Sequence, residues 1–157
     1  MAAFIRSEDA DGGRRVAQAM RRLGRWPRAW ATALLARQLA GAGDHAAVEE
    51  LLAELRAARC SPDAPCLRAQ LAAYARAAQP PADGRVEACF QQLLQLKAER
   101  SAAEDPEVLG DLRRALGRQR FESLSSELGL HTSPLIRREA HARNRVVGRW
   151  GEVLPCE

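Results

Sequence analysis

A helical segment that starts with aspartate occurs twice in this chain, and this repetition constrains the fold more than any other feature. DHAAVEELLAELRAARCSPD begins at Asp44, and DGRVEACFQQLLQLKAERSAAED begins at Asp83. The aligned copies share three apolar positions: Val48 with Val86, Leu52 with Phe90, and Leu55 with Leu93. A single segment of this kind cannot bury its apolar side alone, so the repetition predicts units that stack on one another.

A second helical pattern precedes each of these segments, at residues 29–43 and 64–79. The unit is therefore a helix A, a turn, a helix B and a stop that contains proline. A weaker third copy follows at residues 105–130, with its helix B starting at Arg120, and a half copy precedes the first at residues 11–27. In the half copy we expect one apolar helix face, formed by Val16, Met20 and Leu23.

Residues at the boundaries of these units have the chemistry of helix ends. Asp44 and Asp83 stand at helix starts, where a carboxylate caps free N–H groups and meets the positive end of the helix dipole. Gly43 suits a helix C-terminus. Three prolines break or open helices: Pro27, Pro62 and Pro106. Within the first helix B, the helical period predicts a buried stripe of Val48, Leu51, Leu52 and Leu55.

The composition favours closely packed helices over a sheet. Hydrophobic residues make up 46% of the 157 residues, mostly alanine and leucine, and aromatic residues make up only 4%. No run alternates apolar and polar residues with a period of two. We therefore predict an all-α fold, an α-solenoid of about two to three stacked antiparallel helical hairpins. The expected parts are an N-terminal extension at 1–10, a helical-repeat domain at 11–129, and a basic C-terminal helix or tail at 130–157.

Charge is distributed unevenly along a chain whose formal net charge is +4. Residues 1–43 have eight basic against three acidic residues, residues 44–109 have seven against eleven, and residues 110–157 have nine against six. A nucleic-acid-binding protein usually carries a basic stripe along its working face. The acidic middle argues against such a stripe here unless its acids face away.

The four cysteines, Cys60, Cys66, Cys89 and Cys156, form no C-x-x-C pair, and the three histidines are scattered. A zinc site needs ligand pairs that are closer together. Cys60 and Cys66 flank a Pro-Asp turn, so a disulfide between them is one interpretation. We expect instead reduced cysteines that pack as small apolar residues.

The two full copies resemble pentatricopeptide repeats. The phrases AGAGD…VEELLAEL…CSPD and AAYARA…GRVEACFQQL carry the resemblance, which covers about residues 11–129 and is strongest from 28 to 98. Tetratricopeptide repeats are the neighbouring alternative, but the Pro-Asp spacer favours the former. The resemblance implies a solenoid, a location in a mitochondrion or chloroplast, and binding of single-stranded RNA at one base per repeat.

In that family, a residue near the start of helix A and the last residue of the repeat read the base. The resemblance implies two candidate pairs: Thr32 or Ala33 with Asp63 in the first repeat, and Arg68 with Glu104 or Asp105 in the second. Thr with Asp is a pair that the family uses. Arg68 departs from the small polar residue expected, and Pro65 stands where the family has a stacking aliphatic residue. We therefore expect the second repeat to read no base.

The C-terminal stretch SPLIRREAHARNRVVGRW differs from the repeats in its density of arginine. On a helix from Pro134, three arginines fall near one face: Arg138, Arg145 and Arg149. There they would neutralise phosphates while Trp150 stacks on a base. The alternatives are a solvated helix that closes the solenoid and a tail that docks on an acidic partner protein. The candidate RNA or partner contacts in this stretch are Arg137, Arg138, Arg143, Arg145, Arg149 and Trp150.

The sequence contains no catalytic motif such as G-x-x-x-x-G-K-[ST], G-x-S-x-G or H-E-x-x-H, so we expect no enzymatic activity, no cofactor and no metal. No apolar run approaches the roughly 18 residues of a membrane span. The acidic N-terminus does not resemble a signal or transit peptide, so a targeting segment is either absent or already removed.

Two functions fit these observations. We expect a non-catalytic helical-repeat scaffold or adapter, an accessory subunit of a large organellar assembly whose partners are its protein subunits. Few repeats, an acidic middle and degenerate reading positions support it. The alternative is an RNA-binding factor in organellar RNA metabolism or translation, with single-stranded RNA or rRNA as its partner. The family resemblance and the arginine-rich C-terminal stretch support that alternative.

Overall fold

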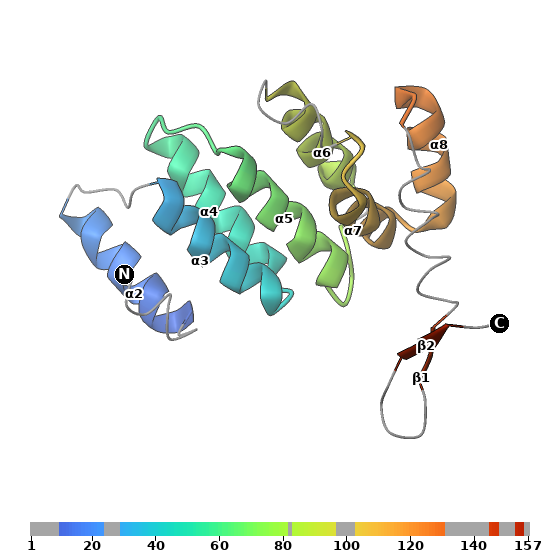
Figure 1. The fold of residues 1–157 in the computed structure, drawn as a ribbon. Helices are drawn as coiled ribbons and strands as arrows, with labels where there is room; N and C mark the ends of the chain where they lie inside the picture. The colour runs from blue at the N-terminus through green and yellow to red at the C-terminus, as the bar shows by residue number, and fades with distance from the viewer. Residues whose placement is uncertain are drawn as a thin grey trace.

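The computed structural model describes residues 10–23, 29–81, 83–96, 103–130, 145–147 and 153–155. Within these ranges the chain forms seven helices (Figure 1): α2 (Ala10–Arg22), α3 (Ala29–Gly41), α4 (His45–Ala57), α5 (Ala64–Arg76), α6 (Arg85–Gln95), α7 (Pro106–Leu116) and α8 (Arg118–Leu128). The predicted all-α fold class is confirmed. Each full copy of the repeated unit supplies two helices, α3 with α4 and α5 with α6.

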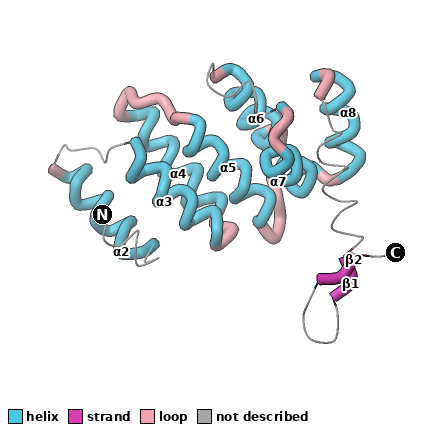
Figure 2. The backbone as a smooth tube through the Cα atoms, viewed as in Figure 1, coloured by secondary structure: helices cyan, strands magenta, loops and turns pink. Residues whose placement is uncertain are grey.

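Two strands of three residues each lie near the C-terminus (Figure 2), and they correct the prediction of a helix there. Strand β1 (Arg145–Val147) pairs antiparallel with β2 (Val153–Pro155), with Val146 opposite Leu154. Of the two alternatives expected for residues 130–157, a helix or a tail, the helix is therefore wrong at residues 145–147. Two short apolar runs separated by a few residues that include glycines are typical of a β-hairpin, and this local signal outweighs the helical spacing of the arginines.

Helices α3, α5 and α7 lie next to one another in that order (Figure 1). Helix α5 contacts α3 on one side and α7 on the other. Helix α4 contacts α3 and α5, whereas α6 contacts α5 and α7. Helix α2 contacts α3 at one end of the row, and α8 contacts α7 at the other. Successive copies of the unit therefore meet mainly through their helix A positions.

Two clusters of buried side chains meet at α5. The side of α5 that faces the first cluster carries small residues, Cys66, Ala69 and Ala73, and these pack with alanines of α3. Small side chains let two helix backbones approach closely. The other side carries large residues that belong to the second cluster, Leu67, Leu71 and Tyr74. Helix α5 is therefore buried on two sides, with eight of its 13 residues buried.

The aligned apolar positions of the two helix B segments are buried, as predicted. Their relative exposures are 0% for Val48 and Val86, 0% for Leu52 and Phe90, and 5% and 0% for Leu55 and Leu93. The fourth stripe residue, Leu51, is also buried. The repeated sequence pattern thus corresponds to a repeated packing position on α4 and α6.

Aspartates cap three of the helices, but not all of the predicted ones. The Asp44 side chain accepts a hydrogen bond from the Ala47 N–H at 3.0 Å and caps α4, as expected. Asp83 is not the cap residue that we predicted, because Gly84, with φ 81°, occupies the cap position of α6. From the preceding position the Asp83 carboxylate still accepts a hydrogen bond from the Arg85 N–H at 3.4 Å, together with one from Arg85 Nε at 2.8 Å. A cap residue with positive φ favours glycine, so the aspartate is displaced by one position.

The half copy packs differently from the prediction. Leu23 is 77% exposed, and Val16 and Met20 are only partly buried. Helix α2 instead buries Gly13 and Ala17, and a Cβ on Gly13 would lie 3.3 Å from Leu35 Cδ1. Small residues give α2 its close contact with α3, so the buried face is not the one with the largest apolar side chains.

Proline and glycine determine the other predicted boundaries. Pro106 is the first residue of α7, as expected, and Pro62 precedes the Asp63 cap of α5. Pro27 lies outside the described residues. The third helix B starts at Arg118 instead of Arg120, because Gly117 has φ 75° and ψ 168°, a conformation that favours glycine and ends α7.

Candidate functional site

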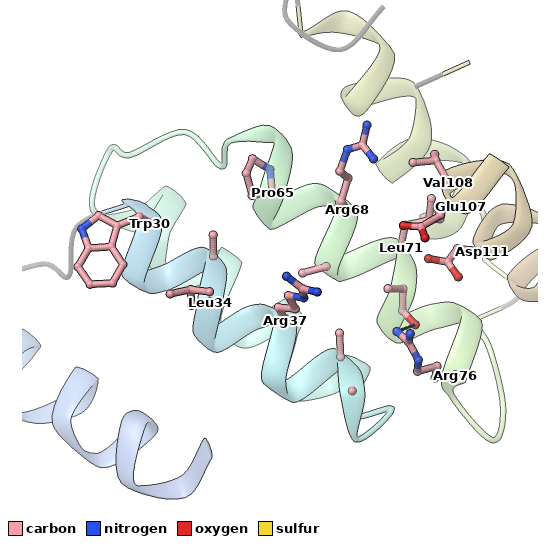
Figure 3. Close-up of a pocket in the computed structure, with 15 residues that line it drawn as sticks. Trp30, Leu34, Arg37, Pro65, Arg68, Leu71, Arg76, Glu107, Val108 and Asp111 are labelled. Carbon is pink, nitrogen blue, oxygen red and sulfur yellow. Dashed lines mark hydrogen bonds between the residues drawn. The ribbon is translucent and has the colours of Figure 1, made fainter. Parts of the chain in front are cut away.

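An open groove of about 720 Å³ extends over α3, α5 and α7 (Figure 3). These are the helix A positions of three successive units. Apolar, basic and acidic side chains all line the groove, including Trp30, Leu34 and Arg37 from α3, Pro65, Arg68 and Arg76 from α5, and Glu107, Val108 and Asp111 from α7. A surface with this mixture resembles a protein interface more than a uniformly basic nucleic-acid surface.

Helix α3 presents one face to the groove through Trp30, Leu34 and Arg37. Their spacing of four and three residues places them on one side of a helix. Trp30 is 51% exposed and Leu34 is 37% exposed, although both are large and apolar. Arg37 is exposed, and it forms no ion pair with any other residue that the structure describes. This edge of the groove therefore combines uncovered apolar surface with an unneutralised positive charge.

An ion pair joins α5 to the start of α7. Arg68 Nη1 donates a hydrogen bond to Asp105 Oδ2 at 2.6 Å. Asp105 also caps α7 by accepting a hydrogen bond from the Glu107 N–H at 2.9 Å. Burial opposes ionisation of Asp105, but the hydrogen bonds from Arg68 and from the backbone outweigh it, so the pKa of this carboxyl lies below its ordinary value.

Acidic side chains of α7 occupy the opposite edge of the groove. Burial raises the pKa of Asp111, while Arg114, at 2.6 Å, and the charge of Arg76 act in the other direction. Glu107 is exposed and has no ion-pair partner within the described part of the chain. The two edges of the groove thus differ in charge: Arg37 is positive on α3, and Glu107 is negative on α7.

A separate polar network joins α4, α5 and α6. Tyr74 donates its hydroxyl hydrogen to Glu49 Oε1 at 2.6 Å and accepts a hydrogen bond from Gln70 Nε2 at 2.7 Å. Arg85 pairs with Glu49 at 2.7 Å. Burial, reinforced by the hydrogen bond to Glu49, raises the pKa of Tyr74, so the phenol stays protonated. These contacts link α4, the helix B of the first unit, to α5 and α6, the two helices of the second unit.

The first predicted reading pair is not assembled on an exposed surface. Thr32 is fully buried, and Ala33, which is 8% exposed, lines the groove with a methyl group that offers a base no hydrogen bond. Asp63 caps α5, and its carboxylate accepts a hydrogen bond from the Cys66 N–H at 3.1 Å. The second predicted pair does come together, because Arg68 and Asp105 form the ion pair between α5 and α7. In that ion pair the guanidinium and the carboxylate neutralise each other's charge.

The predicted contacts of the C-terminal stretch fall largely outside the described residues. This applies to Arg137, Arg138, Arg143, Arg149 and Trp150. Arg145 begins β1, and only its backbone is described. The proposed role of these residues stays a prediction.

Sequence reasoning missed the groove residues Trp30, Leu34, Arg37 and Glu107. Their spacing along α3 is a usable signal, but Leu34 and Leu35 are adjacent apolar residues. When the two helix A segments are aligned, Leu35 matches Leu71 of the second copy and Leu34 matches Gln70. Leu35 is 1% exposed whereas Leu34 is 37% exposed. Distinguishing them requires knowing which side of α3 meets α5.

The cysteine prediction is tested at three positions. Cys60, Cys66 and Cys89 are free, so no disulfide joins Cys60 to Cys66. Cys66 and Cys89 are buried as expected, whereas Cys60 is exposed. Cys156 lies outside the described residues.

Comparison of the chain with protein-family models, with curated proteins and with solved structures gave no match. Among the described helices, none combines the length and the apolar character that crossing a membrane requires.

Proposed function

We propose that this chain is a non-catalytic scaffold or adapter, an accessory subunit of a large assembly. In this proposal the helices form an α-solenoid of antiparallel A–B hairpins of the pentatricopeptide-repeat type. The observation that carries the proposal is the groove, where three successive helix A positions contribute to one open face of mixed character. A face of this kind offers a protein segment both apolar contact and charged anchors.

The charges of the groove favour a protein partner over RNA. Arg68 is neutralised by Asp105 and Asp111 by Arg114, so Glu107 is left as the unpaired acidic side chain at the α7 edge within the described residues. An RNA backbone gains affinity from arginines that are free to replace its counterions, and acidic side chains repel it. The burial of Thr32 also argues against base reading by the first unit.

A second candidate is an RNA-binding factor in organellar RNA metabolism or translation. Exposed Trp30 and Arg37, which lie two turns apart on the same side of α3, favour it, because a base stacks on an aromatic ring while a guanidinium contacts a nearby phosphate. The arginines of the C-terminal stretch would add affinity that does not depend on sequence. The two candidates meet if the assembly is a ribonucleoprotein in which rRNA and protein subunits are both partners.

The proposed location is a mitochondrion or chloroplast, and it rests on the resemblance to pentatricopeptide repeats. Affinity purification of the tagged chain from organelle extract, with and without RNase, tests the proposed function. A defined set of proteins that stays bound after RNase treatment supports the scaffold. Loss of all bound proteins after RNase treatment supports the RNA-binding factor instead.

A further inference from the structure

We propose that the groove binds a peptide segment in which a bulky apolar side chain lies next to a carboxylate. The apolar side chain packs on Trp30 and Leu34, and the carboxylate pairs with Arg37. This inference rests on the proposed scaffold function and specifies the chemistry of its partner.

The apolar part of this site lies at the N-terminal end of α3. Trp30 and Leu34 are among the few large apolar residues of the described chain that remain exposed, and both line the groove together with Pro65 of α5 (Figure 3). Tryptophan and arginine are the residues that most often dominate binding energy at protein interfaces. The other two exposed large apolar residues, Leu23 and Leu128, do not line it.

The charged part of the site is Arg37. Of the groove arginines, Arg68 is held by Asp105 at 2.6 Å, and Arg76 lies within the electrostatic influence of Asp111. Arg37 has no ion-pair partner among the described residues, so its guanidinium is available to a ligand. The planar guanidinium matches a carboxylate through two parallel hydrogen bonds.

The spacing on α3 specifies the spacing in the ligand. Leu34 and Arg37 are three residues apart, which places their Cβ atoms about 5–6 Å from each other on the helix. Alternate residues of an extended peptide are about 6.4–6.8 Å apart on one face, so a bulky apolar residue and a glutamate at alternate positions come close to this spacing. Glu107 on the opposite edge favours a peptide over RNA, since its carboxylate repels the phosphates that every nucleotide carries.

Fluorescence polarisation with labelled probe peptides tests this inference on the full chain. The first probe carries leucine and glutamate at alternate positions in a glycine–serine background. In the second probe lysine replaces glutamate, in the third alanine replaces leucine, and a fourth probe is oligouridine RNA. We expect the wild-type chain to bind the leucine–glutamate peptide more tightly than the other three probes.

Two variants of the groove have matched controls elsewhere on the surface. Arg37→Glu is compared with Arg15→Glu, because both arginines are exposed and the change in charge is the same. Leu34→Ala is compared with Leu128→Ala, because the two leucines are 37% and 39% exposed. Each groove variant should weaken binding of the leucine–glutamate peptide by about tenfold, whereas the controls should leave it unchanged.

The reversal of charge also distinguishes a specific effect on binding from a loss of folding. Arg37→Glu should bind the leucine–lysine peptide more tightly than the wild-type chain does, and an unfolded variant would not. Equal binding of the glutamate and lysine peptides, equal effects of groove and control variants, or tightest binding to oligouridine would each overturn the inference.

The same variants separate this inference from the proposed function. If an RNase-resistant set of partners binds wild type and both groove variants equally, the scaffold stands and the groove inference fails. If RNase treatment releases every bound protein, the scaffold function fails and the inference fails with it. Loss of the RNase-resistant partners from Arg37→Glu and Leu34→Ala alone, with both controls unaffected, supports both proposals.

Discussion

Gly43 is a position at which any side chain would clash with the backbone of a neighbouring helix. It lies between α3 and α4 with φ 71°, in the left-handed region that favours glycine. A Cβ at this position would lie 2.9 Å from the carbonyl oxygen of Arg76 at the end of α5. The turn of the first unit therefore rests directly on the backbone of the second, and this contact requires a residue without a side chain.

Gly84 provides a matched control for Gly43. It also has positive φ, at 81°, but a Cβ there would meet no atom within 4 Å. We expect Gly84→Ala to destabilise the fold by roughly 1–2 kcal/mol, the cost of a left-handed alanine. Gly43→Ala should cost more, because α4 or the end of α5 must also move. Urea unfolding measures both changes, and equal losses would show that the contact with Arg76 is not tight.

Burial also controls the reactivity of the cysteines. Burial raises the pKa of the Cys66 thiol to about 12, with the neighbouring Asp63 charge adding to the effect, and burial raises that of Cys89 to about 12. At about pH 8 these thiols stay protonated and unreactive. Iodoacetamide followed by mass spectrometry should therefore find Cys60 modified in the native chain, with Cys66 and Cys89 modified only after denaturation. Rapid modification of all three without denaturant would contradict the packing around α5.

At the scale of whole helices, the start of a helix could be predicted where only one nearby residue is suited to mark it. Asp44 and Pro106 each mark a helix start that the structure confirms. Where two signals compete, the sequence does not show which one prevails. Asp83 and Gly84 both suit a cap, and the left-handed backbone selects glycine. Residues 137–155 have both helically spaced arginines and two short apolar runs, VV and VL, and strands form at residues 145–147 and 153–155.

The matched stripes of α4 and α6 carry a prediction about stability. Leu52 and Phe90 are both 0% exposed and occupy aligned positions in the two units. Leu52→Ala and Phe90→Ala should each reduce the free energy of unfolding by roughly 2–5 kcal/mol, because each leaves a cavity. Leu128→Ala, at a position 39% exposed, is the control and should change it little. Thermal melts that do not distinguish the core variants from this control would show that the stripes are not packed.

The ion pair between α5 and α7 makes stability depend on pH. Because the folded-state pKa of Asp105 is lowered, the stabilisation is present above the ordinary carboxyl pKa and is lost as the pH falls through the folded value. Asp105→Asn keeps a capping side chain but removes the charge. It should cost about 1 kcal/mol near neutral pH, and the difference from wild type should disappear in acid.

Asp63→Asn is the control for this pH experiment. Asp63 caps α5 as Asp105 caps α7, but it forms no ion pair with the described residues. Chemical denaturation of both variants over a pH series measures the effect. A loss for Asp105→Asn that stays the same at every pH would show that the pairing with Arg68 contributes no pH dependence.

At the scale of the whole molecule, the repetition in the sequence predicts the order of helices but not the surface they create. The groove depends on which sides of α3, α5 and α7 come together, and these contacts join residues far apart in the sequence. A difference of one residue decides whether a side chain of α3 is core or groove, as Leu34 and Leu35 show. For the same reason the burial of Thr32 could not be predicted from the sequence alone.

RNA binding by the isolated chain tests the central claim, that this is a protein scaffold and not a reader of RNA sequence, most directly. Fluorescence anisotropy with several short RNAs over a salt series is the measurement. We predict weak binding without sequence preference that falls steeply with salt, because it comes from arginine–phosphate contacts. The combined change of Arg138, Arg145 and Arg149 to alanine should remove most of it. Nanomolar, sequence-selective binding that survives this change but is lost in Thr32→Ala or Asp63→Ala would contradict the account.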